Sequence, residues 1–218
     1  MPAEEDVSER LCVILTGGSG LPTAPLPNPD LVIAADSGLH LAEGLGLTVD
    51  LIVGDFDSAD PEIVIDAVER GSAIESHPAD KDATDLDLAL TAAGRLGATR
   101  TIVVGGAGGD RIDHFLANTG LIASERHAAV GPEWWVGRLR VWPTREERTV
   151  EGQPGDIVSI VPVGGAATIT TTGLRWGLMK ETLEFGSSRG VSNEMTGTTA
   201  TVQVHSGVVM VAHGEVIS

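Results

Sequence analysis

LIVGDFDSADPEIVIDAVERG, residues 51–71, contains one complete strand-to-helix unit. Its first three residues are apolar, which predicts a buried strand ending in a glycine. Pro61 is a favourable first helical residue and Gly71 a favourable helix stop, so the second part predicts a helix. A strand that is apolar throughout and leads into a helix is typical of a parallel sheet covered on both faces.

The same alternation fills the first half of the chain. Further apolar runs that predict strands occupy residues 11–18, 31–36, 73–78 and 101–106. Helical patterns lie between or after them, at residues 39–47, 84–97 and 111–125. We therefore expect an N-terminal parallel-sheet α/β domain over residues 11–130.

The second half of the chain has a different pattern. From about Leu139 it consists of short β-rich runs separated by Gly, Pro and Thr, with no convincing helix. The runs cover residues 138–142, 156–163, 167–173, 181–186, 199–207 and 208–214. This pattern predicts a C-terminal antiparallel β-sandwich domain over residues 139–218. The boundary is expected between Ala128 and Leu139, and the segment GPEWWVGRLRVWPT, residues 131–144, matches no motif.

Composition narrows the functional classes. The 218 residues carry a formal charge of −17 and only two lysines, which argues against nucleic-acid binding and is compatible with a site for metal cations. The single cysteine, Cys12, excludes an intramolecular disulfide and is expected to be a buried strand residue. No apolar run is long enough to span a membrane, and the acidic N-terminal segment does not resemble a signal peptide, so the cytoplasm is the expected location.

Acidic residues follow the predicted strands of the first half. Asp36 follows one strand, and Asp55 and Asp57 follow the next. The carboxyl ends of parallel strands are where ligands bind, and residues two apart in an extended segment point the same way. Asp55 and Asp57 are therefore candidates for one Mg²⁺ site, although they could instead form a turn or a helix cap. For Asp60 the helix cap is the favoured interpretation.

A second cluster lies in HPADKDATDLDLAL, residues 77–90. Asp82, Thr84 and Asp85 precede or open a helix, where Asp82 or Thr84 could simply be the N-cap. Lys81 beside these carboxylates suits a ligand that carries phosphate. Asp87 is expected on a solvated helix face.

A third cluster is VVGGAGGDRIDHF, residues 103–115. Glycines between a strand and a helix let backbone amides approach phosphate oxygens, and the candidates are Gly105, Gly106, Gly108 and Gly109. The spacing fits neither a Walker A loop nor the dinucleotide fingerprint. Arg111 offers a phosphate clamp and Asp113 another acid, whereas His114 is expected to pack or orient. Residues 16–22 form a second glycine-rich turn, expected on the same side.

Three of these segments, taken in order, resemble the signature segments of thiamine pyrophosphokinases: GDFDS at 54–58, KDATDLDLAL at 81–90 and GGAGGDRIDH at 105–114. ETLEFGSSRGVSNEMTG, residues 181–197, resembles the thiamine-side segment of that family. The family often has GGRxDH, whereas here Asp110 intervenes and leaves Arg111, Asp113 and His114 in register.

The resemblance implies an N-terminal α/β domain, a C-terminal β-sandwich and a homodimer with sites between the subunits. It implies transfer of a pyrophosphoryl group from ATP to the hydroxyl of thiamine, with Mg²⁺, giving thiamine diphosphate and AMP. The metal-side carboxylates would be Asp55, Asp57 and Asp85. The ATP and reaction site would be lined by Asp36, Lys81, Arg111 and Asp113. Ser192 and Asn193, with Trp176 as a further candidate, would approach the thiamine pyrimidine.

Phosphoryl transfer needs positioning and neutralised charge more than covalent chemistry. Arg111 would stabilise charge on the phosphates, and Asp113 is the candidate to accept the proton of the attacking hydroxyl. Three alternatives stay open: another Mg²⁺-dependent phosphoryl or nucleotidyl transferase, an Asp-x-Asp phosphatase, and a non-catalytic thiamine- or nucleotide-binding regulatory module.

Overall fold

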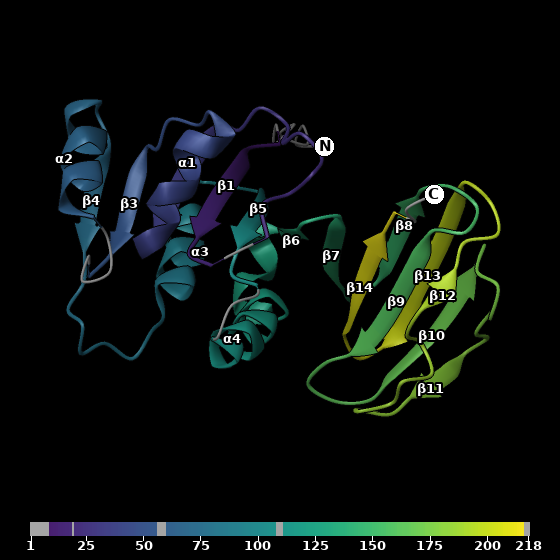
Figure 1. The fold of residues 1–218 in the computed structure, drawn as a ribbon. Helices are drawn as coiled ribbons and strands as arrows, with labels where there is room; N and C mark the ends of the chain where they lie inside the picture. The colour runs from purple at the N-terminus through teal and green to yellow at the C-terminus, as the bar shows by residue number, and fades with distance from the viewer. Residues whose placement is uncertain (1–8, 19, 56–59, 108–110, 216–218) are drawn as a thin grey trace, which may run out of the picture.

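The computed structural model describes residues 9–18, 20–55, 60–107 and 111–215. An α/β half and an all-β half lie side by side (Figure 1). Six parallel strands form the sheet of the α/β half, in the order β4-β3-β2-β1-β5-β6. They are β1 (Leu11–Thr16), β2 (Leu31–Ala35), β3 (Leu51–Gly54), β4 (Ala73–Ser76), β5 (Arg100–Gly105) and β6 (Pro132–Val136).

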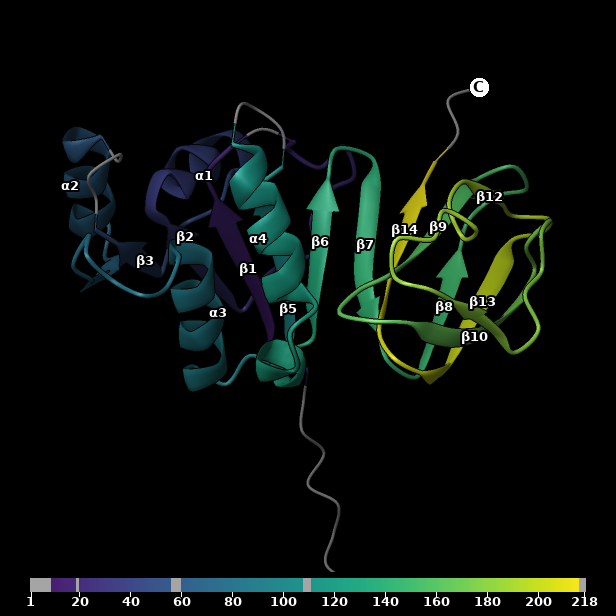
Figure 2. The ribbon, with the colours of Figure 1, turned by 90° about the horizontal axis from the view of Figure 1, so that it is seen from below.

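Helices cover both faces of this parallel sheet (Figure 2). On one face, α3 (Asp85–Arg95) and α4 (Ile112–Ile122) lie over a core that includes Cys12, and on the other lie α1 (Leu39–Leu45) and α2 (Pro61–Glu69). Cys12 is fully buried, and burial raises the pKa of its thiol to about 12, as expected for an inert core residue. A short 3-10 turn, η1 (Asp36–Gly38), follows β2, and a second, η2 (Glu125–Val130), follows α4.

The all-β half packs two sheets against each other around a second apolar core. One sheet has four strands in the order β11 (Glu181–Leu183), β10 (Ala167–Thr172), β13 (Thr199–Ser206) and β8 (Glu147–Glu151). The other contains β12 (Asn193–Glu194), β9 (Ile157–Pro162), β14 (Val209–Gly214) and β7 (Leu139–Thr144). The expected fold class, a parallel-sheet α/β part followed by an antiparallel β-sandwich, is confirmed.

One hydrogen-bonded sheet runs through both halves. β6 pairs in parallel with β5 and antiparallel with β7, so the two sets of strands join into a ten-stranded sheet. β6 lies in the segment that matched no motif in the sequence. Its two neighbouring tryptophans, Trp134 and Trp135, are both buried, and they contribute to the cores on opposite faces of the sheet. A strand buried on both faces lacks the alternation of apolar and polar residues that would have predicted it.

Two expected helix caps are confirmed, and one expectation for the same region is wrong. Asp60 accepts a hydrogen bond from the Glu62 amide at 2.9 Å, and Thr84 accepts one from the Asp87 amide at 3.3 Å. Asp87, however, is only 8% exposed rather than solvated. Its carboxylate is hydrogen-bonded to the buried His127 ring at 2.9 Å and also pairs with Arg126, because η2 packs against this face of α3.

Among the described residues, no helix is long and apolar enough to cross a membrane.

Candidate active site

A cavity of about 420 Å³ lies at the carboxyl end of the parallel sheet. Its walls are the turns that follow β1, β2, β3, β4 and β5, together with the first turn of α3 and the first two turns of α4. The edge of the sheet that the strand pattern predicted for ligand binding is therefore hollow. Of the candidate residues from the sequence, it is lined by Asp36, Asp55, Lys81, Thr84, Asp85, Gly106 and Arg111.

Lys81 joins two of the candidate metal ligands. Its Nζ lies 2.9 Å from an oxygen of Asp55 and 3.0 Å from an oxygen of Asp85. Burial lowers the pKa of Lys81, but its pairing with these two carboxylates outweighs burial, so the pKa lies above its usual value. Two carboxylates from separate elements thus converge on a single positive charge beside the cavity.

The third candidate ligand, Asp57, lies outside the described residues, as do Gly108 and Gly109. Among the residues that the structure does describe, no group of three or more metal-ligating side chains is present. The three-carboxylate metal site therefore stays a prediction.

Asp36 lines the cavity from a strained turn after β2. Its φ of +45° lies in the left-handed region, which residues other than glycine rarely adopt. The turn is also tightly packed, because a Cβ on Gly38 would lie 2.1 Å from the Leu15 carbonyl oxygen. Strain of this kind persists only where the surrounding structure enforces it, and it concentrates at functional sites.

The glycine-rich segment after β5 contributes Gly106 to the cavity wall, while Gly105 lies just behind it at the end of the strand. The Gly106 amide donates a 2.8 Å hydrogen bond to the Gly17 carbonyl, which brings the two glycine-rich turns together as expected. Asp82, by contrast, is exposed and does not line the cavity. Thr84 is the α3 cap and also lines the cavity.

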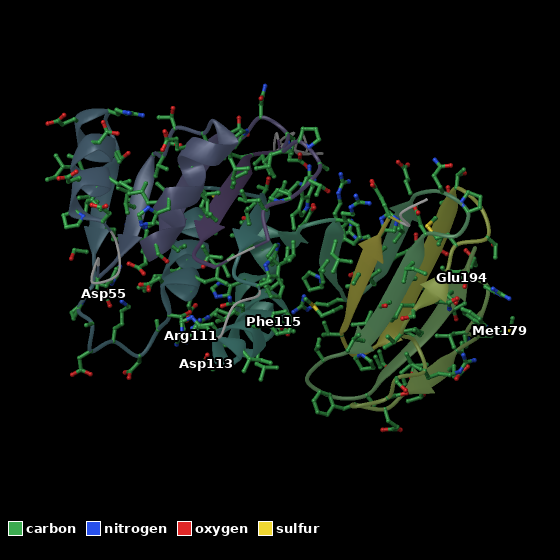
Figure 3. The ribbon with its side chains drawn as sticks, viewed as in Figure 1. Asp55, Arg111, Asp113, Phe115, Met179 and Glu194 are labelled. Carbon is green, nitrogen blue, oxygen red and sulfur yellow. The ribbon has the colours of Figure 1, made fainter. Side chains whose placement is uncertain are left out.

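Arg111 and His114 line the opposite side of the cavity, from the start of α4. The Arg111 guanidinium donates two parallel hydrogen bonds of 3.0 Å to the exposed carboxylate of Asp113, and it also contacts the His114 ring. The hydrogen bonds from Arg111 lower the pKa of Asp113 from its usual 3.8 to about 2. Asp113 itself does not line the cavity. Figure 3 shows Asp55, Arg111 and Asp113 in the α/β half.

The three thiamine-side candidates meet in the all-β half. Ser192, Asn193 and Trp176 line a second cavity of about 310 Å³, together with Arg189 and Val191. Asn193 is 2% exposed, and its side chain is hydrogen-bonded to the backbone of Trp176. Its Oδ1 accepts from the Trp176 amide at 3.0 Å, and its Nδ2 donates to the Trp176 carbonyl at 2.7 Å. Asn193 therefore fixes Trp176, whose side chain is 45% exposed at the cavity.

One buried polar residue of the first cavity, Asn118, was not among the candidates from the sequence. Asn118 is buried on α4, one helical turn after His114, and lines the cavity beside Gly106. The i, i+4 spacing from His114 places both residues on one face of the helix and was the available signal.

The structure is an α/β protein with a cavity lined by charged residues at the carboxyl end of its parallel sheet, the edge at which proteins of this class bind their ligands. Two family models make the class specific. The model for the thiamin pyrophosphokinase catalytic domain matches residues 25–130, and the model for the thiamin pyrophosphokinase vitamin B1 binding domain matches residues 145–209. Together they span most of the chain, which belongs to the thiamine pyrophosphokinase family.

Individual relatives agree with this assignment. Thiamine pyrophosphokinase 2 of Oryza sativa is 29% identical over 163 residues, which are 71% of this chain and 61% of the rice protein. The match thus spans about three fifths of that relative. The thiamine pyrophosphokinase structure from Bacillus subtilis superposes with a TM-score of 0.84 at 23% identity, over 95% of this chain and all of the other. That from Geobacillus thermodenitrificans gives a TM-score of 0.80 at 25% identity, over 95% and 99% of the two chains.

Proposed function

We propose that this protein transfers a pyrophosphoryl group from ATP to the hydroxyl of thiamine, forming thiamine diphosphate and AMP. The observation that carries the proposal is the convergence of Asp55 and Asp85 on one positive charge, in a cavity that also holds a glycine-rich turn and Arg111. Carboxylates that gather around a cation, beside backbone and guanidinium donors, suit a metal–polyphosphate ligand. The cytoplasm remains the proposed compartment, since ATP is supplied there.

Mg²⁺ is the proposed metal, held by Asp55, Asp85 and Asp57. The donor set fits this ion, because Asp55 and Asp85 already share one cationic partner and hard carboxylate oxygens are the ligands that Mg²⁺ prefers. When bound, the ion would neutralise negative charge on the polyphosphate.

The protein's own groups would bind the nucleotide and position it. Lys81 and Arg111 flank the cavity and would contact phosphate oxygens, and the first turn of α4 adds the favourable end of a helix dipole. Gly106 would let the backbone approach the phosphates closely. Asp36, in its strained turn, would line the nucleotide and reaction site.

The role of Asp113 follows from its ion pair. A carboxylate with a pKa of about 2 is a weak base at neutral pH, so we assign Asp113 to orienting Arg111 rather than to accepting the proton of the thiamine hydroxyl. The two parallel hydrogen bonds would hold the guanidinium plane in a fixed direction toward the phosphates.

Thiamine is proposed to bind at the second cavity, with the Trp176 ring as its apolar wall and Ser192 at its edge. The two cavities lie in different halves of the chain, so we propose a homodimer in which each thiamine pocket faces the nucleotide site of the partner. Exposed apolar residues in both halves of the chain support this arrangement. Ile112 and Leu116 on α4 are 71% and 65% exposed, and Met179 and Phe185 in the all-β half are 86% and 71% exposed.

A single assay tests the reaction. The protein is incubated with ATP, Mg²⁺ and thiamine, and the adenine product is identified. AMP together with thiamine diphosphate supports the proposal. ADP would indicate a kinase, and phosphate released without thiamine a hydrolase. Binding of both ligands without turnover would indicate a regulatory module.

A mixing experiment tests the shared site. Asp55→Asn subunits and Asn193→Ala subunits are refolded together. If one chain supplies the nucleotide groups and its partner the thiamine groups, each mixed dimer regains about one good site. Light scattering that finds a fully active monomer would overturn the shared site, and a stable dimer without rescue would place each complete site within one chain.

A further inference from the structure

We propose that Trp134 and Asn118 are positioning residues that fix the backbone of Gly105 and Gly106, and thereby set the affinity of the first cavity for its nucleotide. Trp134 belongs to the segment that matched no motif in the sequence, and Asn118 was not a candidate site residue. The inference rests on the proposed function, because it assigns these residues to the ATP side of the reaction.

The chain leaves the sheet at these two glycines. Gly105 and Gly106 have φ values of +88° and +70°, in the left-handed region that favours glycine. A Cβ on Gly105 would lie 2.1 Å from the Thr16 carbonyl oxygen, so the turn also passes very close to β1. Backbone carbonyls in such a turn need hydrogen-bond partners from outside the sheet ladder.

Trp134 supplies the first of these partners. Its indole Nε1 donates a 2.7 Å hydrogen bond to the Gly105 carbonyl. The side chain is buried, and β6 places it directly opposite Val103 on β5, two residues before Gly105. Its ring also packs against Phe115 of α4, with 5.3 Å between ring centroids. The indole thus holds the last carbonyl of β5 and contacts the helix that carries Arg111 at its N-terminus.

Asn118 supplies the second partner. Its Nδ2 donates a 3.2 Å hydrogen bond to the Gly106 carbonyl, and the side chain is 4% exposed at the base of the cavity. A Cβ on Gly106 would lie 2.8 Å from that Nδ2, so the contact requires glycine. Two consecutive carbonyls are therefore held from two separate elements, β6 and α4.

Holding the Gly105 and Gly106 carbonyls in place should matter most for the ligand that contacts this turn. A cavity wall that is already ordered binds its ligand without the cost of ordering it first. Without Trp134 or Asn118 one buried carbonyl loses its partner, and the peptide unit can rotate away from its position in the cavity wall. The pocket proposed for thiamine lies in the other half of the chain, so its affinity should not change.

Trp135 provides a matched control. It is the next residue on β6 and is equally buried, but its side chain belongs to the core on the opposite face of the sheet. Its Nε1 donates to a Glu133 carboxylate oxygen at 3.1 Å and not to the glycine turn. Replacing either tryptophan with Phe removes one indole donor and the same volume from a buried core.

The test compares Trp134→Phe, Trp135→Phe and the uncharged variant Asn118→Leu in the full chain. Dissociation constants for a non-hydrolysable ATP analogue are measured by calorimetry, and KM values for ATP and thiamine by product formation. We expect Trp134→Phe and Asn118→Leu to weaken analogue binding and raise the KM for ATP by about fivefold or more, the effect of one lost hydrogen bond. The KM for thiamine should stay within about twofold, and Trp135→Phe should change all three values by less than about twofold.

Equal effects of Trp134→Phe and Trp135→Phe on ATP, or equal effects of Trp134→Phe on both substrates, would overturn the inference. If Trp134→Phe does not fold, Asn118→Leu decides the outcome alone, with unchanged analogue binding counting against the inference. A wild-type protein that binds the analogue but forms no AMP from ATP and thiamine would refute the proposed function instead, and the analogue dissociation constants would still test the positioning role.

Discussion

The two cavities proposed to bind substrates are built by different means. At the carboxyl end of the parallel sheet, the wall is made of charged side chains that pair with one another, such as Lys81 with Asp55 and Asp85. In the all-β half, a neutral amide, Asn193, uses its side chain to hold the backbone of Trp176. The first arrangement suits a polyanionic ligand, and the second offers the Trp176 ring to a flat aromatic ligand. The contrast indicates that binding of the two proposed substrates can be disrupted separately.

The largest expected effect concerns the charged cavity. Asp55→Asn keeps the shape of the side chain but removes one of the two charges that converge on Lys81 and, as proposed, on Mg²⁺. We expect turnover to fall about 100-fold or more, since the lost charge acts on the transferring phosphates. Steady-state kinetics at saturating Mg²⁺ measures it.

Asp60→Asn is the control, because an amide oxygen can still cap α2 and turnover should stay near the wild-type value. Near-normal turnover of Asp55→Asn would remove the basis for placing the metal in this cavity.

The second prediction separates stability from chemistry within the same half. Asp87→Ala leaves the buried His127 ring without its carboxylate partner, so the free energy of unfolding should fall by about 2 kcal/mol. The KM values of the folded protein for both substrates should not change. Urea unfolding and steady-state kinetics measure the two effects.

The comparison variant is Asp66→Ala on α2, whose exposed pair with Arg70 should contribute less than about 0.5 kcal/mol. If the two variants lose equal stability, the buried cluster around Asp87 has no special role.

The third prediction concerns the cavity in the all-β half. Asn193→Ala removes the two hydrogen bonds that hold the Trp176 backbone, so we expect the KM for thiamine to rise about tenfold while the KM for ATP stays within about twofold. Asn28→Ala, the same change in an exposed loop, should alter neither value. Equal rises for both substrates would mean that the two halves do not divide the substrates as proposed.

The smallest effect is electrostatic and local. Because Arg111 lowers the pKa of Asp113 to about 2, the carboxylate is ionised at all higher pH values, and the pair is lost only as the pH falls toward 2. In Arg111→Gln the pKa of Asp113 should return toward its usual 3.8. An NMR titration of the carboxyl carbon measures this shift, with Arg70→Gln as the control. An unchanged low pKa would show that the ion pair is not its cause.

The sequence predicted the charged cavity well because its signals are local. Strand ends place Asp36 and Asp55 at one edge of the sheet, and the four-residue spacing from Lys81 to Asp85 brings those two side chains together. The burial of Asp87 was not predictable from its helix, because it is created by His127, 40 positions further along the chain. Ser192, Asn193 and Trp176 were identified only by resemblance, since the hydrogen bonds of Asn193 to the Trp176 backbone form only in the folded chain.

The strand β6 was missed for a related reason. Alternating apolar and polar residues indicate a strand with one face exposed to solvent, whereas Trp134 and Trp135 are both buried. The boundary between the halves was expected in this segment, between Ala128 and Leu139, and the structure has a hairpin there, with β6 and β7 paired through Trp134 and Val141.

That hairpin has a consequence for mechanics and evolution. A flexible linker would let the two halves move independently. Here, backbone hydrogen bonds connect β5, β6, β7 and β14 within one continuous sheet. The two halves are therefore expected to move as one rigid body, and relative motion of the proposed substrate sites would have to come from the contact between subunits of the proposed dimer. Separating the halves by gene truncation near Gly137 would expose two long, unpaired strand edges, which are surfaces prone to aggregation. Recombination of either half onto another protein would require a new partner strand as well as a new partner domain.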